Sequence, residues 1–317
     1  MNKFKKLGAM TGLLVALNLL NACSNTLPNS LISKAEIIDL YDGEIPGALA
    51  TANLEYQRDP AAKDTFLMAV THPNLTAYIA NPKIANGTAV IICPGGAYAG
   101  VSNVKEGDEI ARRFNQIGVS AFVLKYRMPM DVSMQDKSVG PLQDVQQAIH
   151  LVRSHSQQWQ IDANKIGIMG FSAGGHLASS AAVHYQDAVN PQLKGKNLRP
   201  DFQILIYPVI SFDEQITHKG SRQNLLGSDF SEQQRQYFSN ELQVTTETPK
   251  AFIVHAQDDE AVLMENAWVY YQALHTQHVP SQLVLLPQGG HGFGLRNPID
   301  WFQSLDLWMN SEGLLKR

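Results

Sequence analysis

The chain has 317 residues, of which 44% are hydrophobic and 17% are charged, and its formal net charge is −4. This length and composition suit one large globular domain with a sizeable apolar core. The net negative charge argues against nucleic acids and anionic lipid surfaces as binding partners.

The N-terminus has the pattern of a secretory signal peptide. Three lysines precede an apolar run at residues 7–20, and the small residue Ala22 follows shortly afterwards. A basic start, a short apolar middle and a small residue before the cleavage point are typical of such peptides, and this run is too short to span a bilayer. Removal of residues 1–22 takes away three lysines and no acidic residue, and changes the formal net charge from −4 to −7.

The tetrapeptide Leu-Asn-Ala-Cys that ends at Cys23 resembles the lipobox of bacterial lipoproteins. This resemblance implies that Cys23 is lipidated and that its acyl chains anchor the protein without spanning the membrane. Ser24, in place of aspartate, implies the outer membrane rather than retention in the inner membrane. We therefore expect an outer-membrane lipoprotein of the bacterial cell envelope, with an ordinary secreted protein as the alternative. A lipidated Cys23 leaves Cys93 unpaired, so no disulfide framework is available.

Residues 61–317 are expected to form one catalytic domain, after a polar tether and irregular lead-in at residues 23–60. The expected strands are a hairpin at 66–71 and 75–79, and then runs at 89–93, 119–126, 166–169, 202–207, 251–255 and 282–286. Helices are expected at 105–117, from Pro141, after Ser172, at 267–276, and in a last stretch whose Trp301 and Trp308 face the core. Such alternation predicts an α/β fold with a mostly parallel sheet, antiparallel N-terminal strands and helices on both faces.

The sequence Gly-Phe-Ser-Ala-Gly at residues 170–174 fits G-x-S-x-G, the nucleophile elbow of α/β-hydrolases. In such an elbow the serine lies on a strained turn between a strand and a helix, so its hydroxyl projects towards the substrate. The backbone passes so close to neighbouring elements that side chains at Gly170 and Gly174 are expected to clash. Ser172 is therefore the candidate nucleophile.

A serine hydroxyl needs a base that removes its proton, and the base needs a third group that holds it. In α/β-hydrolases these groups follow the serine in the order acid, then histidine. The candidate base is His291, in a glycine-rich loop at residues 288–294 just after the last expected strand. Two other histidines have structural interpretations: His176 packs locally on the elbow helix, and His255 is a buried, hydrogen-bonded group.

The negatively charged oxygen of a tetrahedral intermediate needs backbone N–H donors. One candidate donor is Ala173, directly after the nucleophile. The loop at residues 94–98 reads Pro-Gly-Gly-Ala-Tyr and occupies the position of the H-G-G-G motif of many esterases. Aligned on its glycines, it offers the N–H groups of Gly96 and Ala97. Proline replaces the usual histidine, so any role of that histidine is absent.

Several segments carry a resemblance to bacterial acetyl-xylan-esterase-like α/β-hydrolases. They are residues 90–98, 123–127, 170–177 and 290–294, together with the shorter stretches 224–227 and 248–252. The resemblance runs from about residue 66 to the C-terminus. It implies the α/β-hydrolase fold and ester hydrolysis, with carbohydrate acetate as the substrate.

The resemblance also selects the acid that orients the histidine. In related hydrolases and serine peptidases the acid lies four residues after a strand histidine and three residues before a valine. Counts from His255 and from Val262 both end at Asp259. Asp258 is the alternative, with the capping of a turn or helix as its other role, and Asp213 is a remote third candidate.

The leading interpretation is a serine esterase that removes short acyl groups, acetyl in particular, from carbohydrate. We expect Tyr98 to form a wall of the substrate pocket and residues 211–247 to form a small cap. This segment lacks the apolar face of a lipase lid, which argues against long-chain lipids. The alternatives are a short-chain carboxylesterase without sugar preference, a serine peptidase and a non-catalytic binding protein.

The sequence predicts neither a metal nor another cofactor. None of the ten histidines belongs to an H-x-x-x-H pattern or lies near a pair of cysteines. The expected partners are a small-molecule or oligosaccharide ester and, through the lipid anchor alone, a membrane. Nucleic acid is not expected.

Overall fold

The computed structural model describes residue 1, residues 35–62 and residues 66–316. Cys23 and all but the first residue of the predicted signal peptide lie outside these ranges. Among the described residues, no helix is both long enough and apolar enough to cross a membrane.

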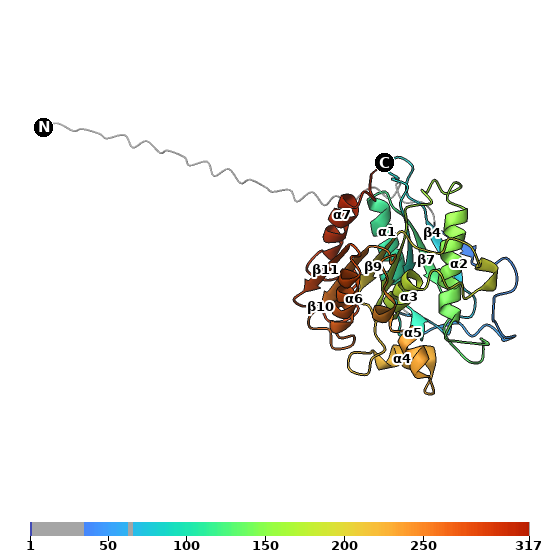
Figure 1. Cartoon of the computed structure of the whole chain (residues 1–317). Coiled ribbons are helices and arrows are strands. Elements are labelled where there is room, and N and C mark those ends of the chain that lie inside the picture. The colour runs from blue at the N-terminus through green and yellow to red at the C-terminus, as the bar shows by residue number, and fades with distance from the viewer. Residues whose placement is uncertain (2–34, 63–65, 317) are drawn as a thin grey trace.

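An eight-stranded sheet forms the centre of the fold, in the order β1-β4-β7-β5-β8-β9-β10-β11 (Figure 1). Its strands are β1 (Glu36–Asp39), β4 (Asn74–Tyr78), β5 (Ala89–Cys93), β7 (Ser120–Lys125), β8 (Ile166–Phe171), β9 (Phe202–Ile206), β10 (Ala251–Ala256) and β11 (Ser281–Leu286). Strand β4 pairs antiparallel with β1 and β7, and the pairs from β7 to β11 are parallel. The predicted fold class, a mostly parallel sheet with antiparallel N-terminal strands, is confirmed.

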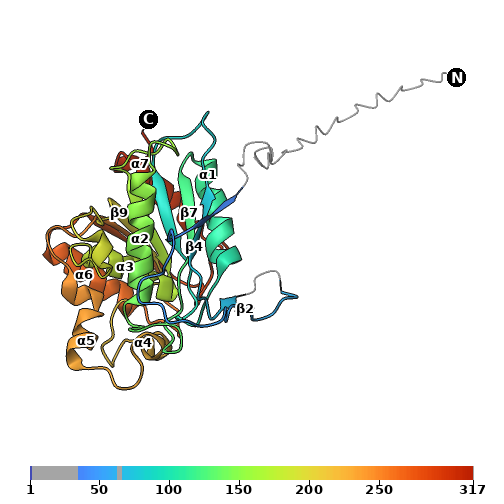
Figure 2. The ribbon, with the colours of Figure 1, turned by 90° about the vertical axis from the view of Figure 1, so that its right-hand side faces the viewer.

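Helices cover both faces of this sheet. On one face, α2 (Gly140–Ser154), α3 (Ser172–Val183) and α6 (Glu265–Thr276) bury their apolar side chains in one core cluster. On the other face, α1 (Glu109–Gln116) and α7 (Trp301–Ser311) bury theirs in a second cluster. Figure 2 shows α1 and α2 on opposite sides of β4 and β7. Because helices cover both faces, β5, β8, β9 and β10 are buried along their whole length and read as continuous apolar runs.

The final helix shows why its tryptophans face inward. Trp301 and Trp308 are buried in the second cluster with Phe302 and Leu305. This apolar face repeats at helical spacing, and the Asp300 carboxylate caps the N-terminus by accepting hydrogen bonds from the N–H groups of Phe302 and Gln303. The prediction that these tryptophans belong to the core is confirmed.

The expected hairpin at residues 66–71 and 75–79 is wrong. Strand β3 (Leu67–Met68) pairs with β2 (Tyr56–Gln57) and β6 (Gly100–Val101) in a separate three-stranded sheet, whereas β4 joins the main sheet. Strand β1, with the sequence Glu-Ile-Ile-Asp, comes from the segment expected to be irregular. It is mostly exposed at the edge of the sheet, so it lacks the apolar run that marks a buried strand.

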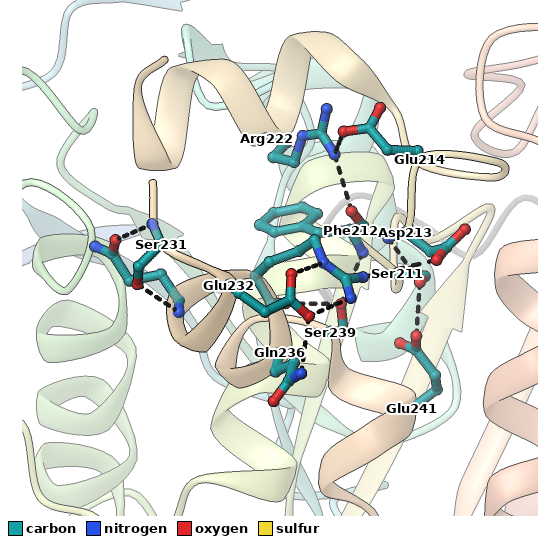
Figure 3. A network of polar contacts seen from close by, with 12 residues as sticks. Ser211, Phe212, Asp213, Glu214, Arg222, Ser231, Glu232, Gln236, Ser239 and Glu241 are labelled. Atoms are coloured by element: carbon teal, nitrogen blue, oxygen red, sulfur yellow. Dashed lines mark hydrogen bonds and ion pairs between the residues drawn. The ribbon is translucent and has the colours of Figure 1, made fainter. Parts of the chain in front are cut away.

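The segment between β9 and β10 contains the helices α4 (Lys219–Leu226) and α5 (Glu232–Tyr237) and the short turn η4 (Asn240–Gln243). Figure 3 shows the polar contacts that hold it together. The Arg222 guanidinium donates to the Phe212 carbonyl oxygen at 2.9 Å, and the Ser211 hydroxyl donates to Glu241 at 2.6 Å. At the start of α5, Ser231 and Gln234 form a reciprocal capping box. This segment, residues 211–247, therefore has a defined helical structure of its own.

Candidate active site

Ser172 begins α3 directly after β8, and its φ of +52° lies in the left-handed region. Two glycines make this turn possible. A Cβ atom at Gly170 would lie 2.0 Å from the Gly174 carbonyl oxygen, and a Cβ at Gly174 would lie 2.1 Å from the Cys93 carbonyl oxygen. Both positions therefore exclude a side chain. The strained turn directs the Ser172 side chain into the loops beyond the sheet.

His291 contacts both Ser172 and Asp259. Its Nε2 atom lies 2.8 Å from the Ser172 Oγ atom, and its Nδ1 atom lies 2.7 Å from the Asp259 Oδ2 atom. A neutral imidazole that donates its Nδ1 proton to the carboxylate accepts at Nε2 from the serine hydroxyl. The three side chains come from the loops and helix that follow β8, β10 and β11, so the parallel sheet brings them to one edge.

Asp259 lies in a pocket of hydrogen-bond donors and is only 4% exposed. Burial acts to raise the pKa of this carboxyl group, but hydrogen bonds from His255 and His291 and the backbone N–H of Val262 outweigh burial and hold the pKa well below its usual range. The Nε2 atom of His255 lies 3.3 Å from the Asp259 Oδ2 atom and 2.8 Å from the Val262 carbonyl oxygen. The expectation that His255 is buried and hydrogen-bonded is confirmed. The surroundings therefore keep Asp259 ionised.

The two other candidate acids do not contact His291. The exposed Asp258 side chain accepts a hydrogen bond from the Gly290 backbone N–H at 2.8 Å, so it ties down the loop that carries His291. Asp213 lies in the helical segment after β9, where it faces Arg235 at 3.6 Å. Of the three aspartates, Asp259 is the one in hydrogen-bond contact with the imidazole.

The loop after β5 carries the candidate oxyanion donors. Within the described chain, no acceptor takes the backbone N–H groups of Gly96, Ala97 or Ala173, so these donors are free to bind an oxygen atom of a ligand. Gly96 and Ala97 line the same cavity as Ser172. A Cβ atom at Gly96 would lie 2.0 Å from the Gly100 carbonyl oxygen, so the loop folds back closely on itself.

This loop is strained and is held in place from outside. Ala97 and Tyr98 have φ values of +54° and +59°, a conformation that costs a non-glycine residue about 1–3 kcal/mol. The Asn224 side-chain amide in α4 donates to the Ala97 carbonyl oxygen at 2.8 Å. The expectation that Tyr98 forms a pocket wall is wrong. Its side chain is 2% exposed, and its hydroxyl lies 2.8 Å from the Nδ1 atom of the buried His176, because the positive φ turns this residue into the core.

His176 is a buried structural residue, but its hydrogen-bond partners are distant in sequence rather than local as expected. Its Nε2 atom lies 2.8 Å from the Phe238 carbonyl oxygen, which fixes the proton on that nitrogen and leaves Nδ1 to accept from the Tyr98 hydroxyl. Burial lowers the pKa of His176 to about 4. This histidine is therefore neutral at physiological pH. It connects α3, the helix after the nucleophile elbow, to the loop at residues 94–98, called the oxyanion loop below.

Glu106 is a site residue that the sequence analysis missed. It lies in the helical turn η2 (Asn103–Asp108), where its carboxylate accepts from the Gly95 N–H at 2.7 Å and from the Tyr207 hydroxyl at 2.8 Å. Burial, the largest effect, raises the pKa of Glu106, although both hydrogen bonds act to lower it. Its sequence signal is its position four residues before the buried Ile110, where a carboxylate interrupts an apolar helical stripe.

Tyr207 extends this network to the loop that carries His291, residues 288–294, called the histidine loop below. Its hydroxyl accepts a hydrogen bond from the Gly294 backbone N–H at 3.1 Å. Its ring packs edge-on against the imidazole of His291, with 5.0 Å between ring centres, and against the ring of Phe293. Glu106 and Tyr207 therefore connect the oxyanion loop to the loop that carries His291.

A cavity of about 420 Å³ opens beside Ser172. Its walls come from the small sheet and its flanks, the oxyanion loop, η2, the segment after β9 and the histidine loop. The lining residues are Arg58, Phe66, Met68, Gly96, Ala97, Ala99, Ser102, Lys105, Glu106, Ser172, His218, His291 and Gly292. In Figure 2, β2 and α4 lie at the same end of the molecule.

The described residues contain no group of three or more histidine, cysteine, aspartate or glutamate side chains that could hold a metal ion. Cys93 is buried and unpaired, and burial raises the pKa of its thiol well above the usual range.

The sheet order and the covering helices define an α/β-hydrolase, and solved esterase structures share this fold. The BD-FAE family model matches residues 75–274, more than half of the sequence, and the chain belongs to this family. An acetylxylan esterase from Xylanibacter ruminicola is 36% identical over 241 residues, which are 73% of this chain and 47% of that protein. Endo-1,4-beta-xylanase B from Butyrivibrio fibrisolvens is 36% identical over 227 residues, 71% of this chain and 35% of that protein. The chain thus spans about half or less of these curated relatives.

Among solved structures, the acetyl ester-xyloside bifunctional hydrolase from Caldicellulosiruptor lactoaceticus is similar over nearly its whole length. It is 33% identical, with a TM-score of 0.74, and the match covers 90% of this chain and 99% of that one. The carboxylesterase Cest-2923 from Lactobacillus plantarum is 25% identical, with a TM-score of 0.65 and coverage of 83% and 99%.

Proposed function

We propose that this protein is a serine carboxylic ester hydrolase that removes short acyl groups, acetyl in particular, from carbohydrate. The observation that carries the proposal is the chain of contacts from Asp259 through His291 to Ser172, with distances of 2.7 and 2.8 Å, at the wall of a cavity. Family membership supports the ester-hydrolase class.

In the proposed first half-reaction, the Ser172 Oγ atom attacks the ester carbonyl carbon while His291 Nε2 accepts the hydroxyl proton. The ionised Asp259 stabilises the resulting imidazolium ion. The N–H groups of Gly96, Ala97 and Ala173 stabilise the charge on the tetrahedral oxygen. His291 then returns the proton to the leaving alcohol, the C–O bond to that alcohol breaks, and an acyl-enzyme remains.

The second half-reaction repeats these roles with water. His291 accepts a proton from a water molecule, which attacks the acyl carbon. The tetrahedral oxygen again binds the donors of the oxyanion loop. Collapse of the intermediate breaks the bond to Ser172 Oγ, which regains its proton from His291, and releases the short carboxylic acid.

The size of the cavity and the relatives support a short acyl group and a carbohydrate alcohol. A volume of about 420 Å³ lies at the lower end of the range for small-molecule sites, which favours a compact ester. The similar proteins include an acetylxylan esterase and an acetyl ester-xyloside bifunctional hydrolase. The second candidate function is a short-chain carboxylesterase without sugar preference, which the apolar side chains Phe66 and Met68 in the lining favour.

Two assays on the same preparation separate these candidates. We expect p-nitrophenyl acetate and propionate to be better substrates than the octanoate, and acetate to be released from acetylated xylan or acetylated xylo-oligosaccharides. The Ser172→Ala variant serves as the control and should be inactive with an unchanged circular dichroism spectrum. Best activity on the octanoate without acetate release would exclude the carbohydrate function, and an active Ser172→Ala variant would exclude the mechanism.

The cell location is a separate proposal, supported by the sequence that ends at Cys23. We propose that Cys23 is lipidated and holds the enzyme at the outer membrane of the cell envelope. Expression in a bacterial host with lipoprotein processing should place the protein in the membrane fraction, and Cys23→Ser should move it to the soluble envelope fraction. An unchanged distribution would exclude the anchor.

A further inference from the structure

The side chains that line the cavity are rich in cations and donors. Arg58 directly follows β2 in the sequence, and Lys105 lies in η2, beside the histidine loop. His218 adds a third donor, because its Nδ1 atom accepts from the Ser221 backbone N–H and a neutral ring therefore carries its proton on Nε2. This local excess contrasts with the net negative charge of the whole chain.

The cations of the described lining outnumber its carboxylates, although the charge of the one carboxylate also acts on Lys105. Glu106 is that carboxylate, and both of its oxygens already accept hydrogen bonds, from Gly95 and Tyr207. Neither Arg58 nor Lys105 forms an ion pair with any described residue. A cationic surface inside an acidic protein concentrates anions from solution.

The two cations are held at the cavity wall. The Arg58 guanidinium carbon lies 4.3 Å from the centre of the Phe66 ring, and this stacking leaves the N–H edge of the group free for a bidentate carboxylate. The Lys105 stem runs along the histidine loop, since a Cβ atom at Gly294 would lie 3.2 Å from its Cγ atom. The exposed Arg58 and the half-buried Lys105 therefore both lie at the wall of the cavity that contains Ser172.

The acceptors that usually recognise neutral sugars are scarce. A sugar hydroxyl donates to carboxylate, amide or hydroxyl oxygens. The described lining contains no aspartate, asparagine, glutamine or tyrosine, and Glu106 is already engaged. Its serines include the candidate nucleophile, Ser172. The cavity thus offers a ligand more donors than acceptors.

We propose that this cavity contains an anion subsite, in which Arg58 and Lys105 bind a carboxylate that the substrate carries in addition to its scissile ester. The inference rests on the proposed ester hydrolysis and narrows its substrate class to acidic esters. The carboxylate can belong to the alcohol, as in an acetylated uronic acid, or to the acyl group, as in the half-ester of a dicarboxylic acid. Arg58 presents a planar fork to it, and Lys105 presents a point charge.

Matched substrate pairs test both sources. The first pair is a mono-acetylated methyl glucuronoside and its neutral uronamide, and the second pair is monoethyl succinate and ethyl butyrate. In one of the pairs, the wild-type kcat/KM should be about tenfold higher for the acid, as expected for a charge-assisted hydrogen bond. Because the site is open to solvent, this ratio should fall as NaCl rises from 50 to 500 mM.

Variants assign the effect to the two residues. Arg58→Gln and Lys105→Gln should each reduce the acid-to-neutral ratio, and the double variant should bring it close to one. Lys194→Gln, which removes the same charge at an exposed position outside the cavity lining, should leave the ratio and the activity at wild-type values. A loss of the ratio only in the cavity variants supports the subsite.

Each result that contradicts the proposal would overturn a different part of it. Wild-type ratios near one in both pairs, with the neutral esters hydrolysed, would overturn the anion subsite and leave the ester-hydrolase function standing. A high ratio that neither Arg58→Gln nor Lys105→Gln reduces would overturn the assignment to these residues. Failure to hydrolyse any of the four esters or p-nitrophenyl acetate would overturn the proposed function and the subsite with it.

Discussion

Two buried carboxylates stand close to His291, and their surroundings give them different properties. Asp259 accepts from two imidazoles and from backbone N–H groups, and these contacts lower its pKa despite burial. Burial is the dominant effect at Glu106 and raises its pKa. The local donors thus decide which carboxylate is held firmly as an anion against the histidine.

Asp259→Asn should reduce kcat on p-nitrophenyl acetate by roughly 10⁴-fold, the size of effect seen when a triad aspartate becomes an amide. The amide lacks the charge that stabilises the imidazolium ion, and it cannot accept the Nδ1 proton at its nitrogen end. The neighbouring Asp258→Asn is the matched control and should stay within about threefold of wild type, because it loses only part of an exposed loop contact. Equal losses in both variants would contradict the assignment.

Glu106→Gln should lower kcat by about 10–100-fold with little change in KM, since hydrogen bonds to a charged acceptor contribute about 1.5–3 kcal/mol. The variant weakens the hydrogen bonds from the Gly95 N–H and from the hydroxyl of Tyr207, whose ring packs against His291. Steady-state kinetics check this effect, with Tyr207→Phe as the partner variant.

Glu106→Gln and Tyr207→Phe share one contact, so the double variant should lose less activity than the product of the two single losses. A Glu106→Gln variant that raises KM alone would assign Glu106 to substrate binding instead.

At the scale of elements, three separate pieces of the chain hold the oxyanion loop. The Tyr126 hydroxyl, just after β7, donates to the Pro94 carbonyl oxygen at 2.7 Å. The η2 turn supplies Glu106, and α4 supplies the Asn224 amide that donates to the Ala97 carbonyl oxygen. These contacts offset the strain of two consecutive non-glycine residues at positive φ.

Asn224→Ala should reduce kcat/KM for p-nitrophenyl acetate by about tenfold, because one hydrogen bond of about 1–1.5 kcal/mol no longer holds the strained loop. The melting temperature should change little, since the side chain is only half-buried. The control is Gln223→Ala, an exposed position on the same helix, which should behave as wild type. Wild-type kinetics in Asn224→Ala would show that the loop keeps its shape without α4.

At the scale of the whole molecule, the parallel strands carry their candidate site residues to one edge. The oxyanion loop follows β5, the elbow follows β8, Asp259 follows β10 and His291 follows β11. The carboxyl ends of parallel strands all face the same way, so residues 195 positions apart in sequence meet in one cavity. Two core clusters, one under each helical layer, pack against the two faces of the sheet.

The lowered pKa of Asp259 links the site to the stability of the whole domain. A carboxyl group with a folded-state pKa below its unfolded value stabilises the fold above the unfolded pKa, about 3.9, and this contribution is lost as the pH falls. The difference in melting temperature between wild type and Asp259→Asn should therefore shrink between pH 5 and pH 3. Differential scanning calorimetry measures it, and a constant difference would contradict the linkage.

Local patterns in the sequence determined much of the protein. Apolar runs marked the buried strands because helices cover both faces of the sheet, and the alternation of strands and helices determined the fold class. The glycines at residues 170–174 marked the elbow because close backbone contact excludes side chains there. Such motifs, which depend on short-range geometry, predicted Ser172 and His291, whereas the resemblance to related hydrolases predicted Asp259.

Only the tertiary structure decided which distant groups meet. It put Asp259 rather than Asp258 in contact with His291, turned Tyr98 into the core, and placed Glu106 under the oxyanion loop. It also replaced the expected hairpin by two sheets, because β3 pairs with β2 and β6 whereas β4 pairs with β1. The exposed β1 leaves no apolar pattern in the sequence that predicts this pairing. These outcomes depend on long-range pairing and on backbone strain, which no local run of residues encodes.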